Sequence, residues 1–143
     1  EDGIDRIETQ CLAISTDGII FKKIKENPVI ACLPEAAHAG HFRDPKIWEH
    51  NGCYYVVIGA QTLEKKGQVL LFESNDLREW HYKNVMAKCN GNQGFMWECP
   101  NFAKVDGQDV FIFSPQGVKP EGNKYLNLHQ SGYMLGKLDY ETR

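Results

Sequence analysis

Short apolar runs, each bounded by turn residues, recur along the whole chain. The runs at 54–60 and 69–74 are rich in valine, isoleucine, leucine and aromatic residues, and β-branched and aromatic residues favour strands. Turn pairs such as Asn51-Gly52 and Asp106-Gly107 separate neighbouring runs. We find no convincing helical spacing of the apolar positions. The pattern therefore predicts an all-β chain of short antiparallel strands.

The predicted strands are joined by two connectors and one long loop. Strands are expected near residues 11–15, 19–23, 43–48, 54–60, 68–74, 80–83, 99–105, 110–114 and 132–138. The connectors cover residues 24–41 and 84–95, where glycine, proline, asparagine and histidine concentrate. The long loop covers residues 115–128.

Residues 45–61 and residues 100–116 repeat each other in register, and we call this the proline repeat. Pro45 matches Pro100, and Gln61 matches Gln116 with the same spacing. The turn pairs and the strands that lie between these positions match in the same register. The two acidic motifs that precede the prolines therefore occupy nearly equivalent places in two copies of one structural unit.

A second repeat, which we call the serine repeat, pairs the end of a strand with the turn that follows it. Ser15, Asp17 and Phe21 match Ser74, Asp76 and Trp80. A third copy is expected near residues 132–139. A period of about 40–60 residues with four strands per unit is typical of the blades of a β-propeller.

We therefore expect part of a β-propeller, with roughly two and a half blades of four antiparallel strands each. Residues 1–24 would form the outer strands of one blade, residues 42–83 a complete blade, and residues 97–143 most of the next. Such an open arc would expose the faces between blades, so self-association through them is expected. The alternative is a coincidental similarity between two hairpins of a β-sandwich.

The composition is that of one globular domain, with 143 residues, 42% hydrophobic and 24% charged. The net charge is −3 and no basic patch is interleaved with aromatic residues, which argues against a nucleic-acid partner. No apolar run approaches the roughly 20 residues of a membrane span, so no membrane partner is expected.

The cysteines are five in number and form no Cys-x-x-Cys pair. This argues against a zinc site or a disulfide scaffold, and for a reducing, cytoplasmic compartment. Cys11 and Cys53 lie in apolar runs and are expected in the core. No histidine has a companion at metal-ligand spacing, so no metal is expected. His38 and His41 fall in the first connector, and all five histidines are expected to be structural or exposed.

The candidate chemistry lies in two carboxylates, Asp44 and Glu98. Each comes at the start of the first strand of its unit, and the first strands of propeller blades line a central channel. We expect the two side chains to converge at one end of this channel. Paired carboxylates in a polar funnel suit the cleavage of a glycosidic bond, because one protonates the leaving oxygen while the other serves the sugar carbon.

The neighbours of the carboxylates predict different roles for them. Trp97 would shield Glu98 from water and so favour its acid form, and Cys99 would donate a weak S–H hydrogen bond to it. Arg43 would keep Asp44 ionised, suited to hold sugar hydroxyls or to stabilise a cation. The alternative is structural: Arg-Asp-Pro as a strand start with a local ion pair, and Trp-Glu as a pair at the rim.

The motifs Phe42-Arg43-Asp44-Pro45 and Trp97-Glu98-Cys99-Pro100 closely resemble those of glycoside hydrolase family 32. The resemblance extends over nearly the whole chain, and the segment 127–133 is most similar to the bacterial sucrose-6-phosphate hydrolases. It implies a five-bladed propeller followed by a β-sandwich, and the retaining hydrolysis of β-fructofuranosides without a cofactor.

By this resemblance, Glu98 is the general acid/base, Asp44 the transition-state stabiliser that holds fructosyl hydroxyls, and Arg43 its substrate-binding neighbour. Trp97 and Cys99 support them, and Asn101 stands where many relatives have aspartate. The family's nucleophile is an aspartate in an Asn-Asp-Pro-Asn-Gly-type motif, which these 143 residues do not contain. We expect it upstream of Glu1 and the β-sandwich downstream, so this chain alone is expected to have no turnover.

Other functions stay open. One is another furanosidase with a five-bladed propeller, such as an inverting arabinan hydrolase. A second is a sugar-binding propeller without catalysis. The sequence leaves open whether the substrate is sucrose, sucrose 6-phosphate or a fructan; Lys119 and Lys124 in the long loop are the candidates for binding a phosphate.

Overall fold

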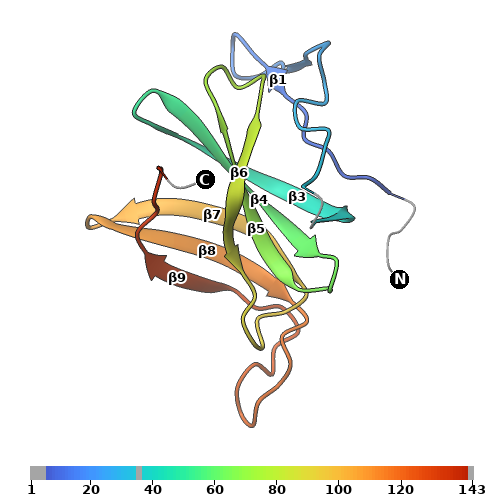
Figure 1. The fold of residues 1–143 in the computed structure, drawn as a ribbon, viewed down its shortest axis with the longest axis vertical. Helices are drawn as coiled ribbons and strands as arrows, with labels where there is room; N and C mark the ends of the chain where they lie inside the picture. The colour runs from blue at the N-terminus through green and yellow to red at the C-terminus, as the bar shows by residue number, and fades with distance from the viewer. Residues whose placement is uncertain (1–5, 35–36, 142–143) are drawn as a thin grey trace.

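The computed structural model describes residues 6–34 and 37–141, which form antiparallel strands in three sheets (Figure 1). The strands are β1 (Ala13–Ile14), β2 (Lys22–Lys23), β3 (Ala37–His50), β4 (Cys53–Thr62), β5 (Gly67–Ser74), β6 (His81–Lys88), β7 (Met96–Val105), β8 (Gln108–Gln116) and β9 (Gly132–Gly136). No helix occurs in this part of the chain, and so none that is long and apolar enough to cross a membrane. The prediction of an all-β chain is confirmed.

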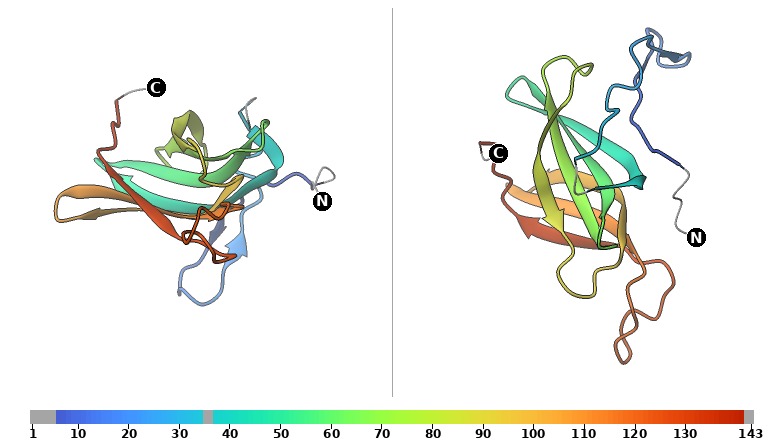
Figure 2. Two further views of the ribbon diagram at one scale, coloured as in Figure 1. Left: turned by 90° about the horizontal axis from the view of Figure 1, so that it is seen from below. Right: turned by 45° about the vertical axis from the view of Figure 1, so that its right-hand side comes forward.

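The sheets are simple meanders in which each strand pairs with the next one along the chain. The orders are β1-β2, β3-β4-β5-β6 and β7-β8-β9. Figure 2 shows the two larger sheets as neighbouring layers, and β7 packs against both β3 and β4. The first strands of the two larger sheets therefore lie close to each other.

The proline repeat of the sequence is also a repeat of backbone structure. Arg43 pairs with Gly59, and Glu98 pairs with Ser114. Directly after each of these pairs the register shifts, between Arg43 and Lys46 in one sheet and at the equivalent position in the other. Both larger sheets thus carry a β-bulge at the same place in their first strand.

The hairpin turns that end these first strands are also equivalent. Asn51 and Gly52 have φ of 52° and 77°, and Asp106 and Gly107 have φ of 50° and 79°. Two successive residues with positive φ make the turn type that matches the twist of paired strands. The turns predicted from sequence are confirmed.

The serine repeat is confirmed by its hydrogen bonds. Asp17 Oδ1 accepts bonds from the backbone of Ile19 and Ile20 at 2.8 and 2.9 Å. Asp76 Oδ1 accepts the same two bonds, from the second and third residues after it, at 2.8 and 2.9 Å. In each turn the preceding serine hydroxyl caps the backbone N–H three residues on, at 2.9 Å.

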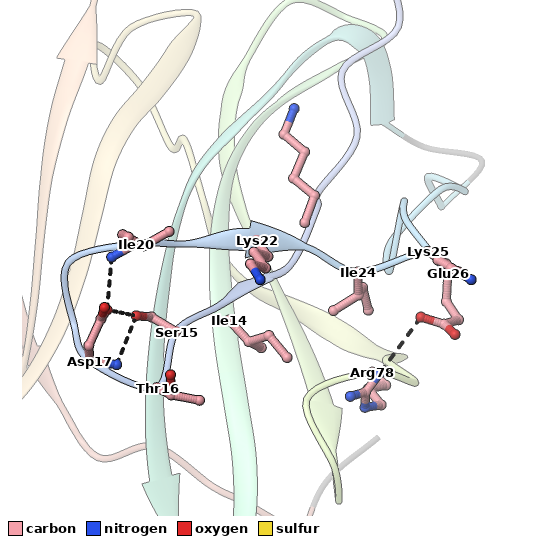
Figure 3. A pocket seen from close by; sticks show the side chains of 11 residues that line it. Ile14, Ser15, Thr16, Asp17, Ile20, Lys22, Ile24, Lys25, Glu26 and Arg78 are labelled. Atoms are coloured by element: carbon pink, nitrogen blue, oxygen red, sulfur yellow. Dashed lines mark hydrogen bonds and ion pairs between the residues drawn. The ribbon is translucent and has the colours of Figure 1, made fainter.

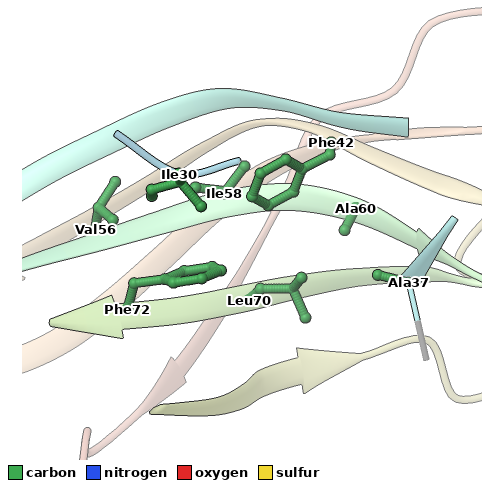
Figure 4. Packing of buried hydrophobic residues seen from close by; sticks show 8 residues of the cluster. All are labelled: Ile30, Ala37, Phe42, Val56, Ile58, Ala60, Leu70 and Phe72. Carbon is green, nitrogen blue, oxygen red and sulfur yellow. The ribbon is translucent and has the colours of Figure 1, made fainter. Parts of the chain in front are cut away.

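Strand β4 is buried on both faces, and its alternate side chains enter two different cores. One core lies toward the N-terminal segment (Figure 4) and contains Ile30, Ala37, Phe42, Val56, Ile58, Ala60, Leu70 and Phe72. The other lies between the two larger sheets and contains Tyr55, Val57, Val69, Leu71, Trp97, Phe111 and Phe113. Each fully buried aliphatic or aromatic side chain stabilises the fold by about 1.5–3 kcal/mol.

Two glycines allow the close approach of the two larger sheets. A Cβ on Gly59 would stand 2.1 Å from the carbonyl oxygen of Trp97, and one on Gly67 would stand 2.3 Å from the Trp97 ring. Neither gap can hold a methyl group. The indole of Trp97 is fully buried and its Nε1 donates to the carbonyl of Gln93 at 2.7 Å.

Several expected boundaries are wrong. The first connector ends earlier than expected, because β3 begins at Ala37, and the second begins later, because β6 continues to Lys88. The two N-terminal strands shorten to Ala13–Ile14 and Lys22–Lys23. Cys11 is exposed, contrary to expectation, whereas Cys53 is half-buried and packs against the core between the two larger sheets. The β1–β2 hairpin buries little surface, so the apolar residues in its sequence do not indicate long strands or a buried Cys11.

Candidate active site

The predicted catalytic residues lie at the two equivalent bulges of β3 and β7. Arg43 and Glu98 occupy the same structural position, as do Asp44 and Cys99. Asp44 and Cys99 have φ of 62° and 49°, a left-handed conformation that a bulge permits but that is uncommon outside glycine. The side chains at the bulge of β3 contact the bulge of β7: Arg43 binds Glu98, and Asp44 binds the backbone of Cys99.

Arg43 and Glu98 form the closest contact of the site. The Arg43 Nη2 and Nε atoms lie 2.8 and 3.1 Å from Glu98 Oε1. Both hydrogen bonds converge on one carboxylate oxygen, which leaves the other for a different partner. Gln116 Nε2 donates to that second oxygen, Oε2, at 2.7 Å. The orientation of the carboxylate is therefore fixed from both sides.

Asp44 joins the two bulges through the backbone. Its Oδ2 accepts a hydrogen bond from the Cys99 N–H at 2.9 Å. The structure therefore brings both predicted carboxylates together, with Arg43 beside them. Both are half-buried, accessible to a small molecule from solvent.

A third carboxylate, Glu8, reaches the same arginine from the N-terminal segment. Glu8 Oε2 lies 3.5 Å from Arg43 Nη1 and accepts a hydrogen bond from the Phe42 N–H. The segment is held beside β3, since the Glu8 N–H donates to the Ala39 carbonyl at 2.9 Å and Gln10 Nε2 donates to the Phe42 carbonyl at 2.9 Å.

The charges around Arg43 act on the titration of the site. Burial disfavours the charged guanidinium, but its hydrogen bond to Glu98 and the charges of Glu8, Glu98 and Asp44 outweigh burial and raise the pKa of Arg43. Arg43 therefore stays charged. Burial lowers the pKa of His41, followed by the electrostatic effects of Arg43, His38 and Arg6. The Nδ1 of His41 lies 3.3 Å from Arg43 Nη1. A neutral His41 accepts a hydrogen bond from the guanidinium.

Cys99 supports Asp44 rather than Glu98. Burial and then the charges of Asp44 and Glu98 raise the pKa of the Cys99 thiol, and its side chain hydrogen-bonds Asp44. The thiol is thus protonated and available as a donor to Asp44. The expected hydrogen bond from Cys99 to Glu98 is replaced by this one.

Trp97 does not shield Glu98 from water, contrary to the expectation from sequence. Successive residues of a strand face opposite sides, so the buried indole packs on Phe113, with ring centroids 4.3 Å apart, while Glu98 faces the site. His38 and His41 were expected in a flexible connector. They lie on β3 and are half-buried, with ring centroids 5.3 Å apart.

Glu98 lines a cavity of about 580 Å³ at the end of the sheet where β7 begins and β8 ends. Phe95, Ser114, Pro115, Gln116, Gly117, Leu128, His129, Gln130 and Ser131 line the rest of it. A second cavity of about 580 Å³ shares Phe95 and Gly117 with the first, and carries Lys65, Lys66 and Lys119. The two cavities therefore adjoin each other at Phe95 and Gly117, and Glu98 lines the first of them.

A third cavity lies away from these carboxylates. It has a volume of about 550 Å³ and lies between the β1–β2 hairpin and Arg78, which is paired with Glu26 at 3.7 Å (Figure 3). Exposed apolar side chains such as Ile14 and Ile20 line it, and neither Asp44 nor Glu98 is among its lining residues. Among residues 6–34 and 37–141, no three histidine, cysteine or acidic side chains are grouped to hold a metal ion.

Two residues of the site were not predicted. Gln116 was found only as a match to Gln61 in the repeat. Gln61 is buried and donates to the Phe95 carbonyl at 2.9 Å, so both glutamines brace the segment that leads into Glu98. Glu8 carried no signal, because it lies in a polar stretch and its partners are distant along the chain.

The comparisons with known proteins agree with one another. Residues 1–143 match the family described as "Glycosyl hydrolases family 32 N-terminal domain". The chain is 48% identical over 144 aligned residues to the sucrose-6-phosphate hydrolase of Bacillus subtilis, an alignment that covers 98% of this chain and 29% of that protein. It is 43% identical over 129 aligned residues to the raffinose invertase of Escherichia coli, with 90% and 26% covered.

Solved structures show the same fold. A GH32 β-fructofuranosidase of Bombyx mori superposes with a TM-score of 0.88 at 46% identity, over 95% of this chain and 29% of that one. A variant of that enzyme was solved in complex with sucrose. The sucrose-6-phosphate hydrolase of Lactobacillus gasseri gives a TM-score of 0.79 at 36% identity, over 92% and 26%. The chain thus spans less than a third of the length of these relatives.

Proposed function

Because the chain belongs to glycoside hydrolase family 32, we propose that it is part of the catalytic domain of a retaining β-fructofuranosidase, which hydrolyses sucrose or sucrose 6-phosphate. The observation that carries the proposal is the cluster of Asp44, Arg43 and Glu98 at two equivalent bulges. A half-buried acid beside a cavity and a second carboxylate that stabilises charge on the sugar are two of the three carboxylates that this reaction would use, and the third is the nucleophile.

The three sheets are blades of a five-bladed propeller in this proposal. The β1–β2 hairpin supplies the outer strands of one blade, sheet β3–β6 a complete blade, and sheet β7–β9 most of the next; the expected ends of the arc at residues 1–5 and 142–143 lie outside the described residues. The proline repeat and the serine repeat support this arrangement. So does the outer face of the last sheet, where Ile112, Tyr133 and Leu135 are exposed although Val57, the equivalent of Ile112, is fully buried by the neighbouring sheet.

The chain's own residues then act as follows. Glu98, as general acid, gives its proton to the glycosidic oxygen, and the bond between that oxygen and C2 of the fructosyl unit breaks. A carboxylate nucleophile from outside this chain bonds to C2. Ionised Glu98 next takes a proton from water, whose oxygen replaces the nucleophile at C2 and releases fructose. Asp44 binds fructosyl hydroxyls and stabilises the positive charge on the sugar in both steps.

Arg43 serves both carboxylates. Its permanent charge lies beside Asp44, and its hydrogen bonds to Glu98 fix the direction of that carboxylate before the sugar binds. Cys99 donates to Asp44, and Trp97 anchors the strand between the sheets. No step uses a cofactor, since proton transfer and a carboxylate nucleophile suffice.

The lysines that line the second cavity support sucrose 6-phosphate, rather than sucrose, as the proposed substrate. The phosphate of that substrate is on the leaving glucosyl unit, which must lie beside the acid that protonates the glycosidic oxygen. Lys119 lines the adjoining cavity with Lys65 and Lys66, whereas Lys124 is not among its lining residues. Lys119→Ala is expected to lower kcat/KM for sucrose 6-phosphate but not for sucrose.

Release of fructose tests the proposed function. The full-length protein is expected to release fructose from sucrose or its 6-phosphate, and Glu98→Gln to lower kcat by about a thousandfold. This chain alone is expected to be inactive, because it lacks the nucleophile. An active full-length protein with no effect of Glu98→Gln would refute the assigned acid. A silent protein that still binds sugar would favour the non-catalytic propeller, and arabinan cleavage would favour the related furanosidase.

The compartment and the assembly are further parts of the proposal. All five cysteines are free thiols, which supports a reducing, cytoplasmic compartment. The exposed apolar face of β8 and β9 supports self-association of the isolated chain. Sedimentation of the isolated chain tests this, and a monomer at all concentrations would contradict it.

A further inference from the structure

The proposed mechanism leaves one charged side chain of the site without a task. Glu8 lies 3.5 Å from Arg43, on the side of the guanidinium away from the 2.8 Å contact to Glu98. The side chains of Glu8, Arg43 and Glu98 are 20%, 23% and 28% exposed. At this depth solvent screens an ion pair only in part.

Glu8 is also held in place by the backbone. Its carboxylate accepts the Phe42 N–H, and its own N–H donates to Ala39. Arg6 binds the carbonyl of Gly40 at 2.9 and 3.1 Å and pairs with Glu8 at 3.1 Å. The carboxylate of Glu8 is therefore at a fixed distance from the bulge of β3.

The general acid must be neutral before it can donate its proton. When Glu98 is protonated, Arg43 loses the negative charge that it binds at 2.8 Å. Within the described part of the chain, the contacts that then remain to the guanidinium are the hydrogen bond to neutral His41 and the ion pair with Glu8, and only Glu8 is charged. Glu8 takes no part in the proposed proton transfer, so its contact with Arg43 is the same in both halves of the reaction.

We propose that Glu8 is a positioning residue, which holds the guanidinium of Arg43 in the site whether Glu98 is protonated or ionised. Glu8 also offsets part of the charge that Arg43 places beside Glu98. The inference rests on the proposed function, since it assigns Glu8 to the same reaction.

The other charged or titratable groups near this pair are Arg6, His38, His41, Asp44 and Cys99. Arg6 pairs with the other oxygen of Glu8, Oε1, at 3.1 Å, but its side chain is 55% exposed and solvent screens its charge more than that of Arg43. Asp44 acts on Arg43 as well, the protonated thiol of Cys99 lies beside Asp44, and Gln116 is neutral. His41 is neutral, and removal of the Glu8 charge would lower its pKa further, because that charge raises it. A change of pH dependence in a Glu8 variant would therefore report on Glu98 and Arg43, and not on a histidine that gains a proton.

The test compares Glu8→Gln, Glu8→Asp and Glu73→Gln in the full-length protein. Glu8→Gln keeps an oxygen for the Phe42 N–H but loses the charge. It is expected to lower kcat/KM about tenfold, the size of one charge-assisted contact, and to move the alkaline limb of the pH–rate profile to lower pH by roughly half a unit to one unit. Glu8→Asp restores the charge and is expected to restore the limb.

Glu73→Gln is the matched control, because Glu73 pairs with Lys83 at 3.0 Å outside the site. It is expected to leave the pH profile unchanged. A Glu8→Gln profile equal to that of the wild type, with or without a lowered Tm, would show a merely structural residue and overturn the inference. A wild type without hydrolysis of fructosides would overturn the proposed function and the inference with it, whereas an active wild type isolates the inference.

Discussion

The sheets β3–β6 and β7–β9 share the same backbone arrangement but carry oppositely charged residues, Arg43 and Glu98, at equivalent positions of their bulges. The bulge in the first strand of one sheet presents Arg43 and Asp44, and the same bulge in the other presents Glu98 and Cys99. The two bulges are joined by an ion pair and by a backbone hydrogen bond. A repeated scaffold thus becomes a site when its copies carry complementary side chains at equivalent positions.

The comparison also separates the residues that pack the sheets together from the residues proposed to act on a substrate. Phe42 and Trp97 precede the reactive residues at equivalent positions, and both are fully buried. Arg43 and Glu98, which follow them, face the opposite side of the strand. Rigid packing on one face therefore fixes the orientation of the chemistry on the other.

Removal of the charge at the first bulge is the largest expected change. Asp44→Asn keeps the size of the side chain and tolerates the positive φ, but it loses the negative charge near the fructosyl cation. We expect kcat/KM to fall by about a hundredfold to a thousandfold. Asp106→Asn is the control, since Asp106 also has a positive φ, 50°, but lies in a turn. Equal activity of Asp44→Asn and the wild type would mean that the two bulges do not share a site.

A methyl group at the contact between the sheets is expected to separate them. The Cβ of Gly59→Ala would meet the Trp97 backbone at 2.1 Å, where no side chain can move away. We expect the free energy of unfolding to fall by about 2–3 kcal/mol, because overpacking strains both sheets.

Gly132→Ala is the matched control, since its Cβ would meet no atom within 4 Å. The position equivalent to Gly59 in the other sheet is Ser114, whose side chain has room to bind Ser131 at 3.2 Å. Urea denaturation measures both variants. Similar stability of the two would contradict the close contact of the sheets.

The equivalent turns at Asp17 and Asp76 predict the smallest effect. Backbone hydrogen bonds from Ile20 and Ile19 lower the pKa of Asp17 from 3.8 to about 2, and those from Glu79 and Arg78 lower the pKa of Asp76. The folded state therefore favours the ionised form. Its stabilising effect is present above pH 3.8 and is lost as the pH falls toward 2.

We expect Asp17→Asn to lower Tm slightly at pH 6, and the difference from the wild type to vanish near pH 2. Asp76→Asn should behave in the same way if the two turns are equivalent. Thermal unfolding at several pH values measures this. A Tm difference that persists at pH 2 would mean that the charge is not the cause.

The sequence predicted what is local or periodic. Strand alternation, the turn pairs and the Ser-Asp turns depend on near neighbours, so the equivalent hairpins and the juxtaposition of Asp44 and Glu98 followed from the repeats. The bulges did not, because a single extra residue on one strand leaves no trace in the hydrophobic pattern.

Contacts between distant segments were also beyond the sequence. Glu8 lies in the N-terminal segment and is separated from Arg43 in the sequence by the whole β1–β2 hairpin. The residues next to Glu8 in the sequence do not indicate that it pairs with an arginine. The expectation that Trp97 shields Glu98 is wrong, because adjacent residues of a strand point to opposite faces even though they are neighbours along the chain. The exposure of Cys11 depends on how little its short hairpin buries.

The stereochemistry of transfer tests the central claim most directly. The full-length protein, incubated with sucrose in water containing methanol, should form methyl β-fructofuranoside, because two displacements at C2 retain the configuration. Glu98→Gln should suppress this product together with free fructose. Methyl α-fructofuranoside as the product would contradict the account, since a single displacement would require a catalytic base in place of the nucleophile.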